Sequence, residues 1–333
     1  MFRFLKLSFI FGISLFLLSA AGGSSRVNSG DSLSFSDMFP ALYFSDRYQD
    51  WVFHEGGRPY WAPTELEEER RLLDQARPFF LNNDIIAFYG HPLSQNMGIL
   101  GRYEIDELNT YLNTVAAEYR EKSGQRGVHK AFYIIYGTVQ PKGEIAYIPD
   151  SLLQKYIRFA LDHKMMVFID HQIGHYDPVE SLKLMLPYLH YPNVHLALDP
   201  EWRTEKPMQQ IGSITAEEIN QAQELMSLYL EKYRLAGDRM LVIHQFHHRM
   251  IEDRMDVRTG YKRVTLVHCA DGFGNPALKR NTYSYLSQAK NMPVKGFKLF
   301  YNFDIPGAGY DDPILSPAEV YDLNPRPCLI MYQ

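Results

Sequence analysis

Two acidic residues close an apolar segment of this chain and are candidates for proton-transfer chemistry. The stretch VHLALDPEW (194–202) ends in Asp199 and Glu201, with Trp202 beside them. Side chains two positions apart in a strand point to the same side, so we expect the two carboxyls to be neighbours. Two adjacent carboxyls do not both ionise easily, and the one that keeps its proton can act as a general acid near neutral pH. The alternative is a pair of acids that forms salt bridges with Arg203 or a loop.

The fold that must position this pair is indicated by alternating apolar and amphipathic segments. Eight short apolar segments are typical of strands buried on both faces, as in a parallel sheet; they lie at 85–90, 131–136, 165–170, 194–199, 240–245, 263–268, 295–300 and 328–332. Helical segments separate most of them. This alternation predicts an α/β fold, a (β/α)8 TIM-like barrel with an N-terminal extension. A doubly wound open sheet is the alternative, but no glycine-rich fingerprint follows the first strand.

The helices between these strands are predicted from apolar spacing and from capping residues. Thr215 and Glu218 form a capping box at the start of the strongest helix, which we expect to end at Gly237. Other helices are expected at 106–122, 151–163, 178–190 with an interruption at Pro187, 276–290, and 316–323 with Ser316 as its cap.

Polar side chains recur where the predicted strands end, which is the face of such a barrel that carries active sites. We expect a substrate-binding set around Glu201 and Asp199, made of Tyr89, His91, Asp170, His171, Trp202, His244, Gln245, His268, Asp271 and Tyr301. Of these, His91, Asp170, Gln245 and His268 should converge with Glu201 in one cleft.

Two other functions compete with proton transfer. His91, His171, His244 and His268 follow four strands, with Asp170 and Asp271 nearby, and such a set could hold Zn²⁺ or another divalent metal for hydrolysis. However, neither His-x-His nor His-Glu-x-x-His spacing is present, so we expect no metal or other cofactor. A non-catalytic barrel that binds glycan is the third possibility, with sugar rings stacked on Trp202, Tyr89, Tyr136 and Tyr301.

The stretch VHLALDPEW and the order of strands resemble the family 18 and family 25 glycoside hydrolases, which are barrels whose fourth strand ends in Asp-x-Glu. The resemblance implies that Glu201 is the general acid/base and that Asp199, its partner, orients the acetamido group of an N-acetylated sugar. The chain departs from the family 18 pattern upstream, where Val194 and Ala197 are apolar, and from the family 25 pattern at His91. The segments ALDPEWR, QQIGS, HQF and YGHPLS also resemble uncharacterised secreted bacterial barrel proteins.

The N-terminal residues have the layout of a secretory signal peptide. Arg3 and Lys6 precede the apolar stretch 7–18, and Ser19-Ala20-Ala21 is a suitable cleavage site, so we expect a signal peptide over 1–21 and a secreted or periplasmic protein. An uncleaved membrane anchor is the alternative. We expect a linker and N-terminal extension over 22–79, with a helix at 64–75, and the barrel domain over 80–333.

The composition of the chain limits the classes of partner that we expect it to bind. The net charge is −5 with both signs mixed, so we expect no nucleic-acid binding. No stretch after the signal peptide has the 18 or so apolar residues of a membrane helix, so no membrane span is expected after cleavage. The 23 tyrosines suit a partner such as a glycan or cell-wall polysaccharide. Cys269 and Cys328 either pair or remain buried thiols. Together these features favour a secreted, glycoside-hydrolase-like barrel.

Overall fold

The computed structural model describes residues 78–333. The expected signal peptide, the helix at 64–75 and nearly all of the N-terminal extension lie outside the described residues. Within the described part, no helix is both long and apolar enough to cross a membrane.

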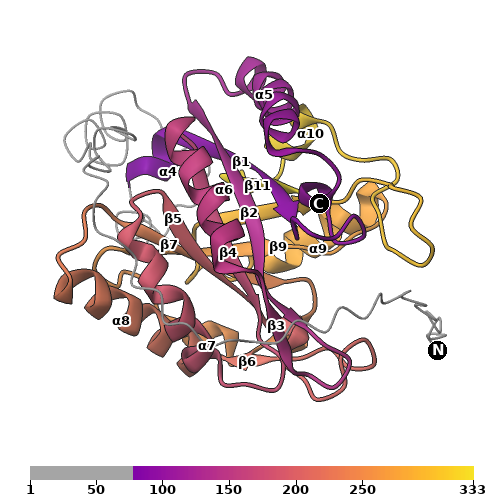
Figure 1. The fold of residues 1–333 in the computed structure, drawn as a ribbon. Helices are drawn as coiled ribbons and strands as arrows, with labels where there is room; N and C mark the ends of the chain where they lie inside the picture. Colours follow the sequence, from indigo (N-terminus) through magenta and orange to yellow (C-terminus); the bar gives the residue numbers. More distant parts are fainter. Residues whose placement is uncertain (1–77) are drawn as a thin grey trace, which may run out of the picture.

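Eight parallel strands close into a barrel (Figure 1). Going round, each strand pairs with the next, and the last pairs with the first: β1 (Asn83–Gly90), β2 (Gly127–Val139), β4 (Met166–Gln172), β5 (Val194–Asp199), β7 (Arg239–Gln245), β9 (Val264–Ala270), β10 (Lys295–Leu299) and β11 (Leu329–Tyr332). The predicted TIM-like barrel is confirmed, and every predicted strand overlaps an observed one. The open-sheet alternative is wrong, because β1 bonds to both β2 and β11.

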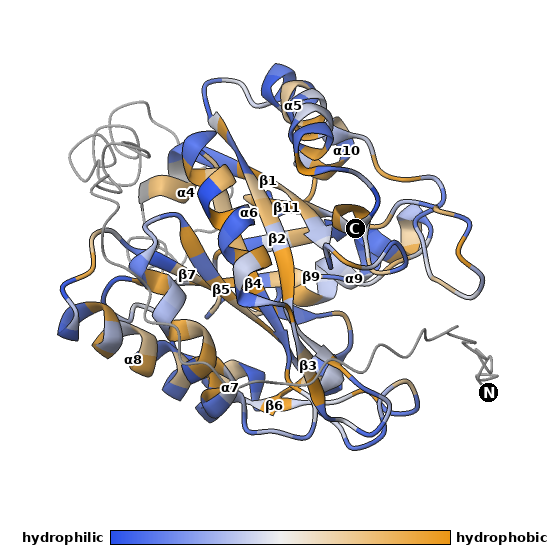
Figure 2. Cartoon of the chain, in the orientation of Figure 1, coloured by the Kyte–Doolittle hydropathy of each residue, from blue (hydrophilic) through white to orange (hydrophobic). Residues whose placement is uncertain are grey.

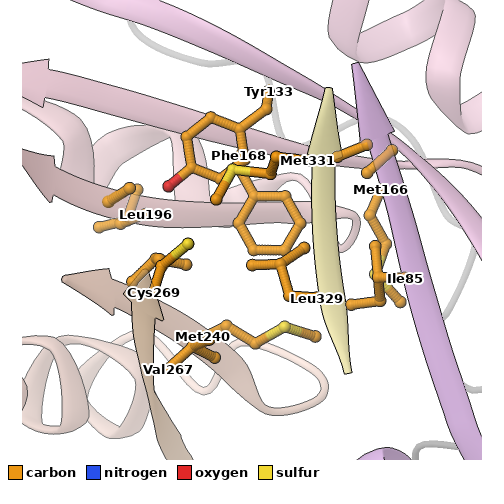
Figure 3. Close-up of a cluster of buried hydrophobic side chains, with 14 of the residues drawn as sticks. Ile85, Tyr133, Met166, Phe168, Leu196, Met240, Val267, Cys269, Leu329 and Met331 are labelled. Carbon is orange, nitrogen blue, oxygen red and sulfur yellow. The ribbon is translucent and has the colours of Figure 1, made fainter. Parts of the chain in front are cut away.

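The barrel closes because its strands are apolar on both faces (Figure 2). Alternate side chains fill the interior, where Tyr133, Phe168, Cys269 and Met331 lie together (Figure 3). A Cβ on Gly296 would lie 3.0 Å from the sulfur of Cys269. The chain therefore keeps a glycine on β10 where the neighbouring β9 side chain occupies the interior. Both cysteines are buried and free, so the predicted alternative of buried thiols is the one observed.

Helices cover the outside of the barrel. They are α4 (Pro78–Asn82), α5 (Ile105–Lys122), α6 (Asp150–Asp162), α7 (Pro178–Met185), α8 (Ala216–Lys232), α9 (Pro276–Ser287) and α10 (Pro317–Tyr321). The caps at Thr215 and Ser316 are confirmed, and a 3-10 helix (Leu186–His190) replaces the α-helix around Pro187. The predicted end at Gly237 is wrong: α8 ends at Lys232, and Arg234 adopts the left-handed conformation that terminates it.

The crossover from β7 to β9, all of it described, has no α-helix. It contains two 3-10 helices, η5 (His248–Met250) and η6 (Arg254–Asp256), and the short strand β8 (Ile251–Glu252). β8 pairs in parallel with β6 (Ile214–Thr215), which lies between β5 and α8. A third short strand, β3 (Ile145–Tyr147), folds back on the end of β2. The loops that follow β5 and β7 are therefore joined by a sheet of their own.

The opposite end of the barrel is held by a buried ionic cluster. Asp84, at the start of β1, accepts hydrogen bonds from Arg126, which precedes β2, and from Arg326, which precedes β11. Arg126 also donates to the carbonyl of Phe80 in α4. Both arginines satisfy a carboxylate that is fully buried, so the cluster fixes the N-terminal ends of three adjacent strands.

Candidate functional site

Polar side chains that point into the barrel gather at its C-terminal end. Strand pairing places neighbouring residues on a common face: Tyr89 of β1 aligns with Tyr133 of β2, and His244 of β7 aligns with Cys269 of β9. The inward-pointing group, here called the inner set, consists of Tyr89, Tyr133, Asp170, Asp199, Glu201, His244, Asp271 and Lys298.

Three carboxyls of the inner set lie together. One oxygen each from Asp199, Glu201 and Asp271 is within 4.8 Å of the other two. Asp199 and Asp271 are 1% and 5% exposed, whereas Glu201 is partly exposed. The expected pairing of Asp199 with Glu201 is observed, although not through a strand: β5 ends at Asp199, and Glu201 lies in the 3-10 helix η4 (Pro200–Trp202).

The backbone around Glu201 is closely held. Gly212 donates its N–H to the Glu201 carbonyl at 2.7 Å, and a Cβ on Gly212 would lie within 2.6 Å of backbone atoms of Pro200 and Arg203. Arg203 bonds to Glu218 at the start of α8 at 2.6 Å. The alternative in which the acid pair serves Arg203 is therefore wrong, since that arginine has another carboxylate. Trp202 donates its indole N–H to Asp199 Oδ2 at 3.1 Å.

His244 links the acids on either side of it. Its Nδ1 lies 3.2 Å from Asp271 Oδ2, and its Nε2 lies 2.8 Å from the Tyr133 hydroxyl and 3.6 Å from Asp170 Oδ2. Burial lowers the pKa of His244, but the carboxylates of Asp170 and Asp271 outweigh it and hold the pKa well above its usual value. His244 is therefore an imidazolium between two carboxylates.

Tyr89 and Lys298 complete the inner set. The Tyr89 hydroxyl donates to Asp170 Oδ2 at 3.0 Å, and the Lys298 ammonium lies 3.6 Å from the centre of the Tyr89 ring. Burial raises the pKa of Asp170, although His244 and Lys298 oppose the shift. The ring of Tyr89 is thus covered by a cation and is not available to stack on a sugar.

The acid pair holds a proton. Burial raises the pKa of Asp199 to about 7, with the charges of Asp271 and Asp170 adding to the effect and His244 opposing it. Burial, and then the charge of Asp199, raise the pKa of Glu201 well above its usual value. A partly exposed, protonated carboxyl beside buried acids is the state that a general acid requires.

The expected convergence of Gln245 and His268 with Glu201 is wrong. These two residues point outward, toward the helices, because they alternate with His244 and Cys269 along their strands. His268 Nε2 lies 2.8 Å from the Gln245 amide oxygen, and its Nδ1 lies 3.1 Å from the Lys295 ammonium. Lys295 also donates to the carbonyls of Leu286, in the last turn of α9, and of Ala289, just after it. We call Gln245, His268 and Lys295 the outer set.

Three more predicted site residues lie away from the acids. His171 alternates with Asp170 and faces Tyr136 and Tyr147 on the outside of the barrel. Tyr301 stacks on Tyr332, whose hydroxyl bonds to Tyr119 of α5. His91 accepts a hydrogen bond from the backbone of Leu93 in its own loop. The stacking surface proposed from Tyr89, Tyr136 and Tyr301 is therefore not formed, and Trp202 remains the aromatic residue beside the acids.

A metal site built from histidines is also wrong, because His171 and His268 point outward while His244 points inward. Within residues 78–333, the group whose geometry could hold an ion is the all-carboxyl trio of Asp199, Glu201 and Asp271. Such oxygen donors suit Mg²⁺ or Ca²⁺. However, the His244 imidazolium, 3.2 Å from Asp271, repels a second cation there, and the Glu201 carboxyl holds a proton that an ion would have to displace.

Sequence reasoning omitted Tyr133 and Lys298 from the candidate set. Tyr133 lies in the middle of β2, where a tyrosine is indistinguishable from a core residue. Lys298, by contrast, is a lysine inside the short strand β10, which is buried throughout. A charged residue at that position was a usable signal, because an unpaired buried charge is costly.

No family model matches this chain, and no curated protein matches it. Solved structures do: a 2,3-dimethylmalate lyase of the PEP mutase/isocitrate lyase superfamily has 10% identity and a TM-score of 0.42, covering 80% of this chain and 78% of that chain. The GH18 chitinase ChiB of Flavobacterium johnsoniae has 8% identity and a TM-score of 0.40, covering 75% of this chain and 87% of that chain. A family 18 chitinase from Crocus vernus has 10% identity and a TM-score of 0.40, covering 75% of this chain and 92% of that chain. The chain folds as a TIM-like barrel, and family 18 chitinases are among the solved structures similar to it.

Proposed function

We propose that this protein hydrolyses a glycosidic bond in a glycan, with Glu201 as the general acid/base and Asp199 as its partner. The observation that carries the proposal is the position of Glu201: it is partly exposed, it lies within 4.8 Å of two buried carboxyls, and the nearby Arg203 is engaged elsewhere. Glu201 is the most exposed residue of the trio.

The chemistry follows from the proton on Glu201. Burial and the charge of Asp199 raise its pKa well above the usual value, which favours the protonated carboxyl. Transfer of that proton to the glycosidic oxygen releases the leaving sugar as an alcohol instead of an alkoxide. The resulting carboxylate can then take a proton from water, which makes the same residue a general base in the second half of the reaction.

The inner set also has the features of a site that binds a ligand. Oδ1 of Asp170, of Asp199 and of Asp271 is buried and has no hydrogen-bond partner among the described residues. Buried polar atoms without partners are costly, so the arrangement is consistent with a site that a hydroxyl-rich ligand completes. A glycan or cell-wall polysaccharide supplies such hydroxyls, in keeping with the secreted or periplasmic location that the signal peptide predicts.

The proposal is tested with the mature chain and a panel of cell-wall, N-acetylated and unmodified glycans, with products read by mass spectrometry. Glu201→Gln keeps the shape of the side chain but removes the transferable proton, so turnover should fall about 10²–10⁴-fold. Glu205→Gln, an exposed acid in the same loop, is the matched control and should be unaffected. Full activity of Glu201→Gln on a substrate that the wild type cleaves would refute the proposal, and loss of activity in EDTA would point to the metal alternative.

A further inference from the structure

We propose that Asp271 is the nucleophile of this reaction, so that hydrolysis proceeds through a covalent glycosyl–Asp271 ester and retains the anomeric configuration. The inference rests on the proposed function and adds to it the identity of the second carboxyl. Three observations support it: the spacing of the acids, the hydrogen bonding of Asp271, and the different surroundings of Asp199.

The spacing separates the two ways in which a pair of carboxyls can cleave a glycosidic bond. Carboxyls that act with inversion stand roughly 6.5–9.5 Å apart, because a water molecule must fit between one of them and the sugar, whereas retaining pairs stand roughly 5–5.5 Å apart. Oxygens of Glu201 and Asp271 lie within 4.8 Å of each other. Oxygens this close favour direct attack by a carboxylate over attack by an intervening water.

The contacts of Asp271 place its carboxylate beside a cation. Its Oδ2 lies 3.2 Å from His244 Nδ1, while its Oδ1 is buried and has no hydrogen-bond partner in the described part of the chain. His244 is in turn fixed by Tyr133 and Asp170 at its other nitrogen. The imidazolium therefore orients the Asp271 carboxyl group.

Asp199 is the less suitable nucleophile. Among the described residues no ion pair involves Asp199. Its Oδ2 accepts a hydrogen bond from Trp202, a neutral donor. Burial raises its pKa to about 7, so a substantial fraction is protonated at neutral pH. A protonated carboxyl does not attack carbon, and Asp199 is better placed to hold Trp202 and to keep the pKa of Glu201 high.

The two steps balance as follows. A carboxylate oxygen of Asp271 donates an electron pair to the anomeric carbon while the bond from that carbon to the leaving oxygen breaks, and the Glu201 proton goes to the leaving oxygen. In the second step a water oxygen bonds to the anomeric carbon, one water proton passes to Glu201, and the ester bond to Asp271 breaks. No oxidant, reductant or metal is needed, and the substrate requires no acetamido group of its own.

That last point distinguishes the inference from the mechanism that the family 18 resemblance implies. There the acetamido group of the sugar takes part in the reaction, so a sugar without it would not react. Here an enzyme carboxylate provides the nucleophile, so the same leaving group on a sugar with a plain 2-hydroxyl should be released. Paired 2,4-dinitrophenyl glycosides with and without the 2-acetamido group separate the two mechanisms directly.

The decisive experiment uses the wild-type chain and needs no variant. It is incubated with 2,4-dinitrophenyl 2-deoxy-2-fluoro glycosides of the sugars that it is found to cleave, and then digested and analysed by mass spectrometry. We expect one fluoroglycosyl group per chain, on the peptide that contains Asp271. A label on Asp199 instead, or natural products of inverted configuration, would overturn the inference while leaving Glu201 as the acid. Failure of every glycan and glycoside to react would overturn the proposed function as well.

Variants give an independent readout. Asp271→Gly should be almost inactive but should form a glycosyl azide of opposite anomeric configuration when azide is added, because azide occupies the space of the missing carboxylate. Asp304→Asn, an exposed acid in the loop after β10, is the control and should keep wild-type activity. Thermal unfolding followed by circular dichroism confirms that the glycine variant is folded. A folded Asp271→Gly variant that azide leaves inactive, or that keeps a tenth or more of wild-type activity, would contradict the role of Asp271.

Discussion

The inner set and the outer set arise from neighbouring residues of the same strands, yet their hydrogen bonding differs. In the outer set, Lys295 bonds to His268 and to two carbonyls at the C-terminal end of α9, and His268 bonds to Gln245. In the inner set, Asp170, Asp199 and Asp271 each keep one buried oxygen without a partner within the described residues. A network that is internally satisfied stabilises the fold, whereas one that leaves buried acceptors open is prepared for a ligand.

The two sets also differ in charge. The outer set contains a fully buried ammonium held by neutral groups, and burial lowers the pKa of Lys295 well below its usual value. The inner set contains four carboxyls with two cationic side chains among them, His244 and Lys298. Buried polar residues thus serve different purposes in the two sets, and the face of the strand to which they point decides which purpose it is.

The largest predicted effect contrasts the two histidines. His244→Gln removes the cation that orients Asp271, and a misplaced reacting group costs about 10²-fold in rate, so kcat/KM should fall by at least that factor. His268→Gln should leave kcat/KM within about threefold, because His268 does not face the substrate, but should lower the melting temperature. Steady-state kinetics and thermal unfolding of both variants test the contrast, and equal losses of kcat/KM would show that the outer set belongs to the active site.

The second prediction concerns the pH dependence of stability. The pKa of Asp199 is raised to about 7 in the fold, against about 3.9 in an unfolded chain, so the unfolded state releases its proton first as the pH rises. The wild type therefore loses stability between about pH 4 and pH 7, by about 4 kcal/mol from this group alone. Asp199→Asn cannot ionise and should escape this loss. Urea unfolding at pH 4.5 and pH 8 measures it, and parallel pH profiles for variant and wild type would contradict it.

The third prediction addresses the outer set. Lys295→Met fills the same space but leaves the carbonyls of Leu286 and Ala289 and the ring of His268 without their donor. Unsatisfied buried acceptors cost about 1–3 kcal/mol, so the free energy of unfolding should fall by that amount, with kcat/KM unchanged. Lys122→Met, at the exposed end of α5, is the control and should be close to neutral. A stabilised Lys295→Met variant would mean that burying the ammonium costs more than its bonds return.

The smallest predicted effect is a shift in the pH profile of activity. A general acid must be protonated, so activity declines on the alkaline side as Glu201 ionises. Asp199→Asn removes the negative charge that helps to raise the pKa of Glu201, and the alkaline decline should therefore move to lower pH. The dependence of kcat/KM on pH for both forms provides the measurement. A decline that stays in place would assign it to a group other than Glu201.

The sequence was sufficient for the barrel because each strand is a short apolar run bounded by helix caps such as Thr215 and Ser316, and both signals are local. It also identified Asp199 and Glu201, although η4 and not a longer β5 brings them together. It failed at His171, Gln245 and His268 because a position at the end of a strand does not say which face the side chain takes. For β5, alternation along the strand from His195 to Asp199 indicates which side chains share a face. In the other strands, no residue of known orientation showed which face points into the barrel.

The pairing of β6 with β8 has a consequence for anyone who wishes to change the specificity of this barrel. Barrel enzymes are often treated as modular, with each loop open to replacement without disturbing the others. Here the segment that follows Glu201 and the crossover after β7 share two backbone pairs, Ile214 with Ile251 and Thr215 with Glu252. Exchange of either loop alone would strip the other of its partner strand. The two loops therefore depend on each other structurally, and a library that varies one of them should vary the other as well.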